Sequence, residues 1–341
     1  MDKEIQSILQ SPAHSNILEL RTVRKWFPSG MYPLDLAFGK GLPVGHIIEI
    51  MGDEKVGKTA LLLHLVKQLY KGKDNLVYYC ENETTLYADR VTQVGVDWER
   101  LKSFVTEFNT LEETFSYIET VLKNVCAARA KGYVGTVGIF LDTLTAGSNK
   151  RETEDAKGRQ QEYFKAHRAT NSGVCKEFFR RCNVLIARAE VMMIIVNQVT
   201  YNVNCMFGDP RESSGGGKGL AFFESGKLDM TRGKTHKQKT KNRLGNLVEK
   251  EIGFQSTIKT KNIKTGGKNN RLLHFDVYYA NGVDPYSSIF YALQEGKYTT
   301  TSGNCIMYEG KQLTRTDMQS FVEKNPQLTR KIKQDLEEYY K

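Results

Sequence analysis

One short segment limits the folds open to this chain more than any other, the run GDEKVGKT from Gly52 to Thr59. It fits the pattern GxxxxGK[ST], in which backbone N–H groups of a glycine-rich turn surround a phosphate where a helix begins. The apolar run at 46–51 predicts a strand directly before it. Five apolar residues at helical spacing predict a helix over 58–70: Ala60, Leu61, Leu62, Leu65 and Leu69. This strand-loop-helix order predicts a nucleoside triphosphate site.

Three further apolar runs, at 76–80, 137–141 and 192–196, are short and nearly continuous. Strands of this kind, separated by helical patterns, are typical of a parallel sheet that helices cover on both faces. The predicted fold class is therefore α/β, a mostly parallel twisted sheet flanked by helices. We place this core at 31–283 and a small helical C-terminal domain at 284–341.

Composition narrows the classes of protein further. Apolar residues make up 40% and charged residues 26% of the 341 residues, which excludes a mostly disordered or fibrous chain. The net charge of +10 indicates polyanionic partners. The six cysteines are scattered without a CxxC pair, so a reducing compartment is expected. No run approaches about 18 consecutive apolar residues, which predicts a cytoplasmic protein without membrane contact.

Polar residues at the ends of the predicted strands suit phosphate chemistry. Asp142 closes its strand and suits a magnesium anchor together with Thr59. Glu81 and Glu83 follow a strand that we expect next to the phosphate-binding strand. Either carboxylate could orient or deprotonate water, and spacing alone does not choose between them. Gln198 follows the last of these strands, where an amide contacts a γ-phosphate or simply caps the strand.

Three polar stretches interrupt the α/β pattern. The first two, at 147–173 and 199–219, are long loops of the kind that usually carries function. The third, at 226–271, holds 13 Lys or Arg against 3 Asp or Glu, an excess equal to that of the whole chain. Two interpretations of this basic segment stay open: a solvated surface hairpin, or a site that binds a polyanion.

Longer motifs give the chain a family resemblance. The run at 29–52 and its P-loop resemble the entry to the ATPase core of the RecA recombinases, and MFGDPRESSGGG at 206–217 is similar to their second DNA-binding loop. The motif NGVDPYS at 281–287 resembles the T4-like phage recombinases, and 307–332 resembles the bacterial RecA C-terminal domain. The likeness covers most of residues 29–341 in the family's order.

This resemblance implies an ATP-dependent DNA recombinase that forms helical filaments on single-stranded DNA. Homologous pairing and strand exchange would accompany DNA-stimulated ATP hydrolysis, with ATP and Mg²⁺ bound between protomers. Residues 1–30 would be a polymerisation arm. Double-stranded DNA at a second site, a single-strand-binding protein and a mediator are the further implied partners. The alternative is a ring-forming RecA-fold helicase or translocase, which a helicase domain or linker would mark.

The resemblance also implies roles for single residues of the nucleotide site. Counting back from Gly95-Val96-Asp97, the catalytic glutamate falls on Glu83, and Gln198 takes the place of the γ-phosphate switch residue. Arg90 stands where the family has an aromatic residue against adenine; a guanidinium also stacks on a base. Lys261 and Lys264 would reach the ATP of the neighbouring protomer. The other predicted nucleotide contacts are Gly52, Asp53, Glu54, Lys55, Val56, Gly57, Lys58, Thr59, Ala60 and Asp142.

The two long loops and the basic segment supply the predicted DNA contacts. Val203, Met206 and Phe207 are apolar candidates for wedging or stacking against bases, or for packing of a hinge. The polar candidates around the loops are Arg180, Arg181, Arg211, Ser213, Ser214, Gly215, Gly216 and Gly217. Those of the basic segment are Lys234, Lys237, Lys239 and Lys241.

Overall fold

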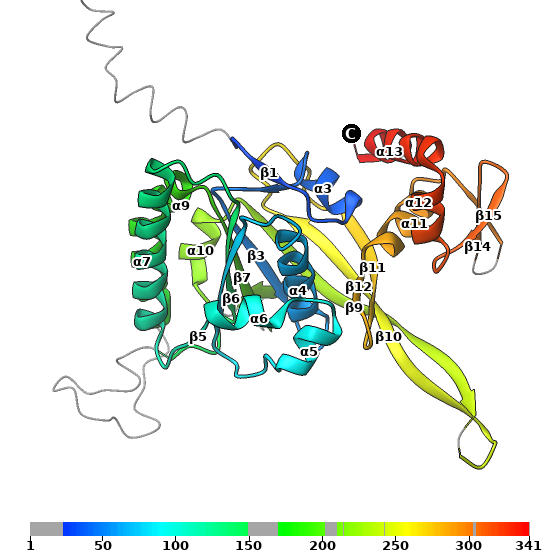
Figure 1. The fold of residues 1–341 in the computed structure, drawn as a ribbon, viewed down its shortest axis with the longest axis horizontal. Helices are drawn as coiled ribbons and strands as arrows, with labels where there is room; N and C mark the ends of the chain where they lie inside the picture. The colour runs from blue at the N-terminus through cyan, green and yellow to red at the C-terminus, as the bar shows by residue number, and fades with distance from the viewer. Residues whose placement is uncertain are drawn as a thin grey trace, which may run out of the picture.

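A large sheet forms the centre of the protein (Figure 1), seen in a computed structural model that describes residues 23–148, 170–201, 210–213, 215–241, 243–302 and 305–340. Its strands are β3 (Ile47–Gly52), β4 (Leu76–Glu81), β5 (Val105–Glu107), β6 (Val137–Asp142), β7 (Val191–Tyr201), β8 (Arg211–Ser213), β9 (Gly226–Lys241), β10 (Leu247–Lys261), β11 (Leu272–Tyr278) and β12 (Gly282–Asp284). They run in the order β12-β11-β10-β9-β3-β7-β6-β4-β5, and β8 pairs with β7.

The half of the sheet from β9 to β5 is parallel, which confirms the predicted α/β class. The prediction that β4 lies next to the phosphate-binding strand β3 is wrong. Strands β7 and β6 lie between them. Both intervening strands are apolar and buried on both faces, and such strands take the central positions. The register places Gly52 level with Gln198 and Glu81 level with Asp142. These four residues therefore meet at one edge of the sheet, although Gln198, predicted to follow its strand, lies inside β7.

Helices cover both faces of the sheet (Figure 1). On one face lie α3 (Tyr32–Phe38), α4 (Lys58–Leu69), α5 (Ala88–Gln93) and α6 (Trp98–Leu101), followed by a short 3-10 turn at Lys102–Phe104. On the other lie α7 (Leu111–Ala130), α9 (Thr170–Ala189) and α10 (Gly217–Phe223). Helix α4 ends one residue before the predicted limit and buries the predicted leucines Leu61, Leu62 and Leu65.

The two faces have separate apolar cores. Leu62 and Val66 of α4 belong to one buried cluster, and Phe115, Phe178 and Phe179 to the other. In the second cluster the rings of Phe115 and Phe178 stack with centroids 4.1 Å apart. A stacked aromatic pair adds about 1 kcal/mol to the burial of its area, so α7 and α9 are held firmly together.

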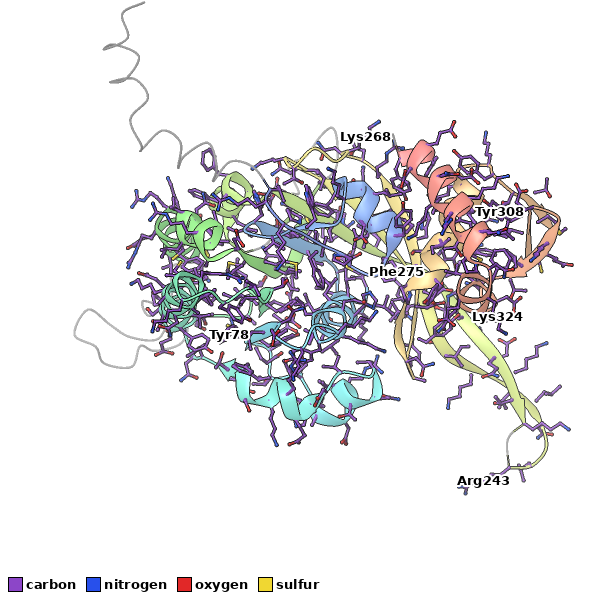
Figure 2. All side chains as sticks on the ribbon, turned by 45° about the horizontal axis from the view of Figure 1, so that its top comes forward. Tyr78, Arg243, Lys268, Phe275, Tyr308 and Lys324 are labelled. Carbon is purple, nitrogen blue, oxygen red and sulfur yellow. The ribbon has the colours of Figure 1, made fainter. Side chains whose placement is uncertain are left out.

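The C-terminal region contains helices α11 (Pro285–Glu295), α12 (Met318–Lys324) and α13 (Pro326–Tyr340). It also contains an antiparallel sheet that the sequence did not predict, made of β13 (Thr300–Ser302), β14 (Cys305–Tyr308) and β15 (Lys311–Thr314). Tyr308, labelled in Figure 2, is buried, and its hydroxyl donates to Asp335 at 2.7 Å. The region shares one apolar cluster with the main core through Phe290, Leu293 and Leu336.

The described end of the predicted polymerisation arm packs onto the body. Strand β1 (Trp26–Phe27) pairs with β2 (Leu42–Pro43), and Ser29 is fully buried. The carbonyl of Ser29 also bonds His64 Nε2 of α4 at 2.8 Å. Residues 26–29 of the predicted arm are therefore part of the folded body, and a polymerisation role of the arm stays a prediction. Residues 1–22 lie outside the described part of the chain.

The basic segment forms a long hairpin of β9 and β10 that projects from the sheet (Figures 1 and 2). The lysines have more acidic neighbours than the sequence indicated. Glu249 lies directly opposite Lys239, Glu251 lies opposite Lys237, and Lys237 Nζ is 3.3 Å from a carboxylate oxygen of Glu249. Cross-strand pairing brings these acids in from the returning strand.

Candidate functional site

A cavity of about 310 Å³ opens at the carboxyl edge of the parallel strands, beside the loop between β3 and α4. Residues from four separate stretches of sequence line it: Glu54, Lys55, Gly57, Lys58, Thr59, Ala60, Glu83, Asp142, Thr143 and Gln198. Most of the predicted nucleotide residues therefore meet in one place. Gly57 has a φ of 99°, a backbone conformation that glycine adopts without strain, and this turn leads directly into α4.

The ammonium group of Lys58 lies within the loop. Its Nζ donates to the carbonyls of Gly52 at 2.9 Å and Asp53 at 2.7 Å. Burial lowers the pKa of Lys58, while the carboxylates of Glu83 and Asp142 act in the opposite direction. A lysine among backbone N–H groups at a helix N-terminus suits a bound phosphate.

Asp142 and Thr59 fit a magnesium ion. Asp142 is 1% exposed, and its Oδ2 accepts hydrogen bonds from Thr59 Oγ1 at 3.0 Å and Tyr79 OH at 2.8 Å. Its Oδ1 is buried without a hydrogen-bond partner among the described residues. Burial raises the pKa of Asp142, while the two hydroxyl donors lower it. An unpaired buried carboxylate oxygen is costly, and Mg²⁺, which prefers oxygen ligands, would compensate it directly or through water.

The two candidate glutamates have different surroundings. Glu83 lines the cavity, where its Oε1 accepts from Thr143 Oγ1 at 3.0 Å and Gln198 Nε2 at 3.3 Å. Glu81 is 1% exposed, and its Oε1 accepts the backbone N–H groups of Glu83 and Thr85, both at 3.1 Å. Burial raises the pKa of Glu81 to about 7. The geometry therefore assigns the cavity to Glu83 and the support of the loop to Glu81.

Several supporting residues were missed by the sequence analysis. Tyr79 looked like an ordinary core residue of its strand, yet its hydroxyl holds Asp142. Tyr201 OH is 3.1 Å from both carboxylate oxygens of Asp53. From the base of the hairpin, Arg232 donates to the carbonyl of Lys55 at 3.2 Å, and Ser256 Oγ donates to that of Val56 at 2.9 Å. No local signal in the sequence marks these long-range contacts.

Arg90, Lys261 and Lys264 do not line the cavity. Arg90 of α5 donates to the carbonyl of Tyr279 and to Gln93. Lys261 Nζ is 2.9 Å from Asp229 Oδ2, and Lys264 Nζ donates to the carbonyls of Ala221 and Phe222. A role of the two lysines toward a neighbouring protomer stays a prediction. An adenine contact of Arg90 stays a prediction.

The predicted DNA contacts after β7 are engaged with the body in the structure. Arg211 is 2.9 Å from Asp229 and 3.5 Å from Asp53, and Ser213 Oγ accepts from Lys227 at 3.1 Å. Gly215 exchanges hydrogen bonds with Asn197, and Gly216 and Gly217 lead into α10. These contacts connect the end of the loop to the strands that carry the cavity.

The remaining loop predictions are only partly visible. Arg180 is exposed on α9, whereas Arg181 forms ion pairs with Glu119 at 2.9 Å and Glu177 at 3.5 Å. Four predicted DNA contacts lie outside the described residues: Val203, Met206, Phe207 and Ser214.

A buried carboxyl pair lies close to the cavity. Glu49 of β3 accepts from Asn197 at 2.7 Å and is 2.7 Å from Lys227 Nζ, which is also 3.7 Å from Glu224. Burial and the adjacent Glu49 raise the pKa of Glu224 to about 8. Burial also opposes ionisation of Glu49, but the hydrogen bond from Glu224 and the charge of Lys227 outweigh it and lower the pKa of Glu49. At neutral pH Glu224 therefore carries the proton of the pair.

This proton makes stability depend on pH. Because the pKa of Glu224 is raised on folding, the folded chain binds one more proton than the unfolded chain between about pH 5 and pH 8. The free energy of unfolding should fall across this window by up to about 1.4 kcal/mol per pH unit from this group. Glu224→Gln should flatten that slope in urea titrations. Glu338→Gln, at an exposed helix position, is the control, and an unchanged slope in Glu224→Gln would contradict the assignment.

Comparison with known proteins indicates one family. Residues 3–284 match the family model of the RecA N-terminal domain. The chain is 26% identical to proteins named Protein RecA from Mesorhizobium japonicum over 332 residues, Brucella anthropi over 336 and Chelativorans sp. over 332. These matches cover 96%, 97% and 96% of this chain and 81%, 83% and 82% of the relatives.

These relatives are bacterial, so the likeness of 281–287 to phage recombinases stays a prediction. Within the described residues, no helix is long and apolar enough to cross a membrane. The family model matches residues 3–284, which is most of the chain. The chain therefore belongs to the RecA family.

Proposed function

We propose that this protein is an ATP-dependent DNA recombinase, which forms helical filaments on single-stranded DNA and catalyses homologous pairing and strand exchange. One observation supports this proposal most strongly. Lys58, Thr59, Asp142, Glu83 and Gln198 come from four separate stretches of the chain and meet around one cavity. Such a site supplies phosphate binding, a metal anchor, a carboxylate for water and an amide for the γ-phosphate.

Each of these residues has a distinct task in hydrolysis. The P-loop and Lys58 hold the phosphates of ATP, and Thr59 and Asp142 hold Mg²⁺, which would offset the phosphate charge. Glu83 orients the attacking water and accepts its proton. Gln198 donates to Glu83 at 3.3 Å and lies in the same strand, β7, that leads toward the loop at 199–219. A bound γ-phosphate would thus change the position of Gln198 and, through β7, the conformation of the predicted DNA loop.

Self-association is part of this proposal. The ring of Phe222 is 76% exposed, and Lys264 donates to the carbonyl of the same residue at 2.9 Å. An exposed aromatic residue beside Lys264, which is predicted to reach a neighbouring ATP, suits a contact between copies of the chain. The loops at 147–173 and 199–219 would grip the single strand along the assembled filament. A single-strand-binding protein, a mediator and a cytoplasmic location stay predictions that rest on the family resemblance.

Electron microscopy tests the assembly. The protein is mixed with a slowly hydrolysed ATP analogue and single-stranded DNA, and a strand-exchange assay follows under the same conditions. Helical filaments with strand exchange would support the recombinase. Closed rings that unwind a forked duplex would favour the helicase alternative, and absence of any ordered assembly would contradict both.

The hairpin is the proposed second DNA site. Lys237, Lys239 and Lys241 alternate along β9 and therefore share one face of the hairpin, whereas Lys234 lies at a register shift and lines a separate cavity near the C-terminal region. Of the four predicted lysines, three therefore belong to the proposed site on the hairpin, and Lys234 does not. Since Glu249 and Glu251 lie opposite two of these lysines, the site should be weaker than the lysine count alone suggests.

Changing Lys237, Lys239 and Lys241 together to glutamine should weaken duplex capture and strand exchange. Each DNA phosphate that a lysine no longer neutralises should flatten the log–log salt dependence of duplex binding by about 0.9. ATP turnover stimulated by single-stranded DNA should stay within about twofold, because the hairpin tip does not contribute to the cavity. Lys297→Gln with Lys324→Gln and Lys333→Gln, three exposed lysines of the C-terminal region, is the charge-matched control. A parallel loss of turnover and duplex capture would show that the hairpin belongs to the primary site.

A further inference from the structure

The hairpin ends in apolar side chains that face solvent. At its tip Leu244 is 84% exposed, Leu247 is 70% exposed and Val248 is 40% exposed. They lie where the chain turns from β9 to β10, next to Arg243, which Figure 2 labels at the far end of the hairpin. We name Leu244, Leu247 and Val248 the apolar tip.

The sheet does not require this extension. Strand β11 pairs with β10 only from Gly253 to Lys259. Beyond His236 five further residue pairs, about 17 Å of strand, continue without a third strand among the described residues. An isolated two-stranded ribbon is marginally stable in water, so the projection costs stability rather than adding it. Lysines on its edges are explained by protection against edge pairing, but an apolar tip works against solubility and needs an occupant.

The register shows what kind of occupant fits. Leu247 lies opposite Lys241, and Val248 lies opposite Thr240. Residues that follow each other along a strand point to opposite faces, so Leu247 and Val248 lie on the two faces of the ribbon. Leu244 lies in the turn between the strands. A flat protein surface would cover one face of the hairpin and leave the other exposed to solvent. A narrow slot would enclose both faces of the apolar tip.

The positive charge of the hairpin indicates which kind of partner offers such a slot. From Lys237 to Glu251 the hairpin holds five Lys or Arg and two Glu. Basic residues flanking an exposed leucine match the way in which proteins push apolar wedges between base pairs while cations hold the phosphates on either side. A protein partner would need both an acidic surface and a narrow slot. Duplex DNA has both properties when one base step is opened, because its phosphates are negative and the gap between the base pairs is narrow.

We propose that the apolar tip is a wedge that enters the incoming duplex between adjacent base pairs and unstacks them. This inference rests on the proposed second DNA site and adds an activity to it: the hairpin opens the duplex as well as holding it. Lys239, Lys241 and Arg243 bind the phosphates beside the opened step, and Leu244 and Leu247 pack against the bases that have been separated. Opening at the tip would present bases for comparison with the single strand held by the primary loops.

Fluorescence of 2-aminopurine in the duplex measures this unstacking. Filaments are formed on single-stranded DNA with a slowly hydrolysed ATP analogue, and a duplex of unrelated sequence is added so that strand exchange does not contribute. The wild-type protein should raise the fluorescence of the bound duplex. Leu244→Ser with Leu247→Ser should reduce this rise by about fivefold or more, while duplex affinity changes by less than about threefold. Both leucines are exposed, so an unchanged thermal midpoint is expected.

Lys239→Gln with Lys241→Gln is the matched control. It should flatten the salt dependence of duplex binding by up to about 1.8 and lower the fluorescence per bound duplex by less than about twofold, because Arg243 and both leucines are retained. Wild-type fluorescence in the leucine variant would overturn the wedge. If the leucine variant forms shorter filaments than the wild type in the absence of DNA, the wedge proposal is overturned, and a second copy of the chain is the occupant of the apolar tip. A wild-type filament that binds no duplex yet hydrolyses ATP with single-stranded DNA would remove the wedge and leave the recombinase proposal standing.

Discussion

Lys58→Ala should abolish ATP turnover and ATP-dependent DNA affinity together. We propose that this side chain binds the phosphates of ATP; its Nζ lies 2.9 Å and 2.7 Å from two carbonyls of the P-loop. Removing one such preorganised donor typically costs about 10²–10³-fold in rate. Without bound nucleotide, Gln198 would also no longer order the DNA loop as we propose, so DNA affinity should fall as well. The measurements are steady-state ATP hydrolysis and single-stranded DNA affinity with and without ATP analogue.

Lys67→Ala is the matched control for this variant. Lys67 lies on the same helix, α4, but its Nζ donates to the carbonyl of Val94, outside the cavity. Turnover close to that of the wild type is expected. Wild-type hydrolysis in Lys58→Ala would refute the nucleotide site, and loss of hydrolysis with full ATP-dependent DNA binding would separate the two activities that we expect to be coupled.

Glu83→Gln should leave ATP and DNA bound but stop hydrolysis. The amide keeps the size of the side chain and its contact with Thr143, while it cannot accept a proton from water. Loss of a general base lowers the rate by about 10²–10⁴-fold. The variant should therefore accumulate as a stable ATP-bound filament on DNA. Turnover measurements and dissociation of labelled DNA after ATP addition check both parts.

Glu81→Gln is the informative control because it lies two residues away. Its carboxyl supports the loop through the N–H groups of Glu83 and Thr85, and burial raises its pKa to about 7. A glutamine oxygen accepts the same bonds, so turnover should stay within about threefold of the wild type. If Glu81→Gln is the inactive variant, the assignment of the two glutamates is reversed.

The local parts of the fold could be predicted from the sequence. Strand β3, the P-loop and helix α4 were placed to within about one residue, because a phosphate loop is a continuous motif and the leucines of α4 repeat at helical spacing. Asp142 was found because it ends an apolar strand. The likeness to a family then selected Glu83, and the structure places this residue in the cavity.

Other features required the tertiary structure. The acids opposite Lys237 and Lys239 come from the returning strand of the hairpin, so the lysine run looked unpaired along the chain. The C-terminal sheet consists of strands of three or four residues, too short for a period-2 pattern to show. Tyr79 and Arg232 looked like a core residue and a surface cation, yet they support Asp142 and the P-loop.

The sequence by itself therefore determined the α/β class, the phosphate loop and most of the residues around it. Only the tertiary structure decided the strand order, with β7 and β6 between β3 and β4, the separate environments of Glu81 and Glu83, and the exposure of the apolar tip. The physical reason is the range of the interactions. Motifs and periodicity are set by neighbours along the chain, whereas strand order, burial and cross-strand pairing depend on residues that only folding brings together.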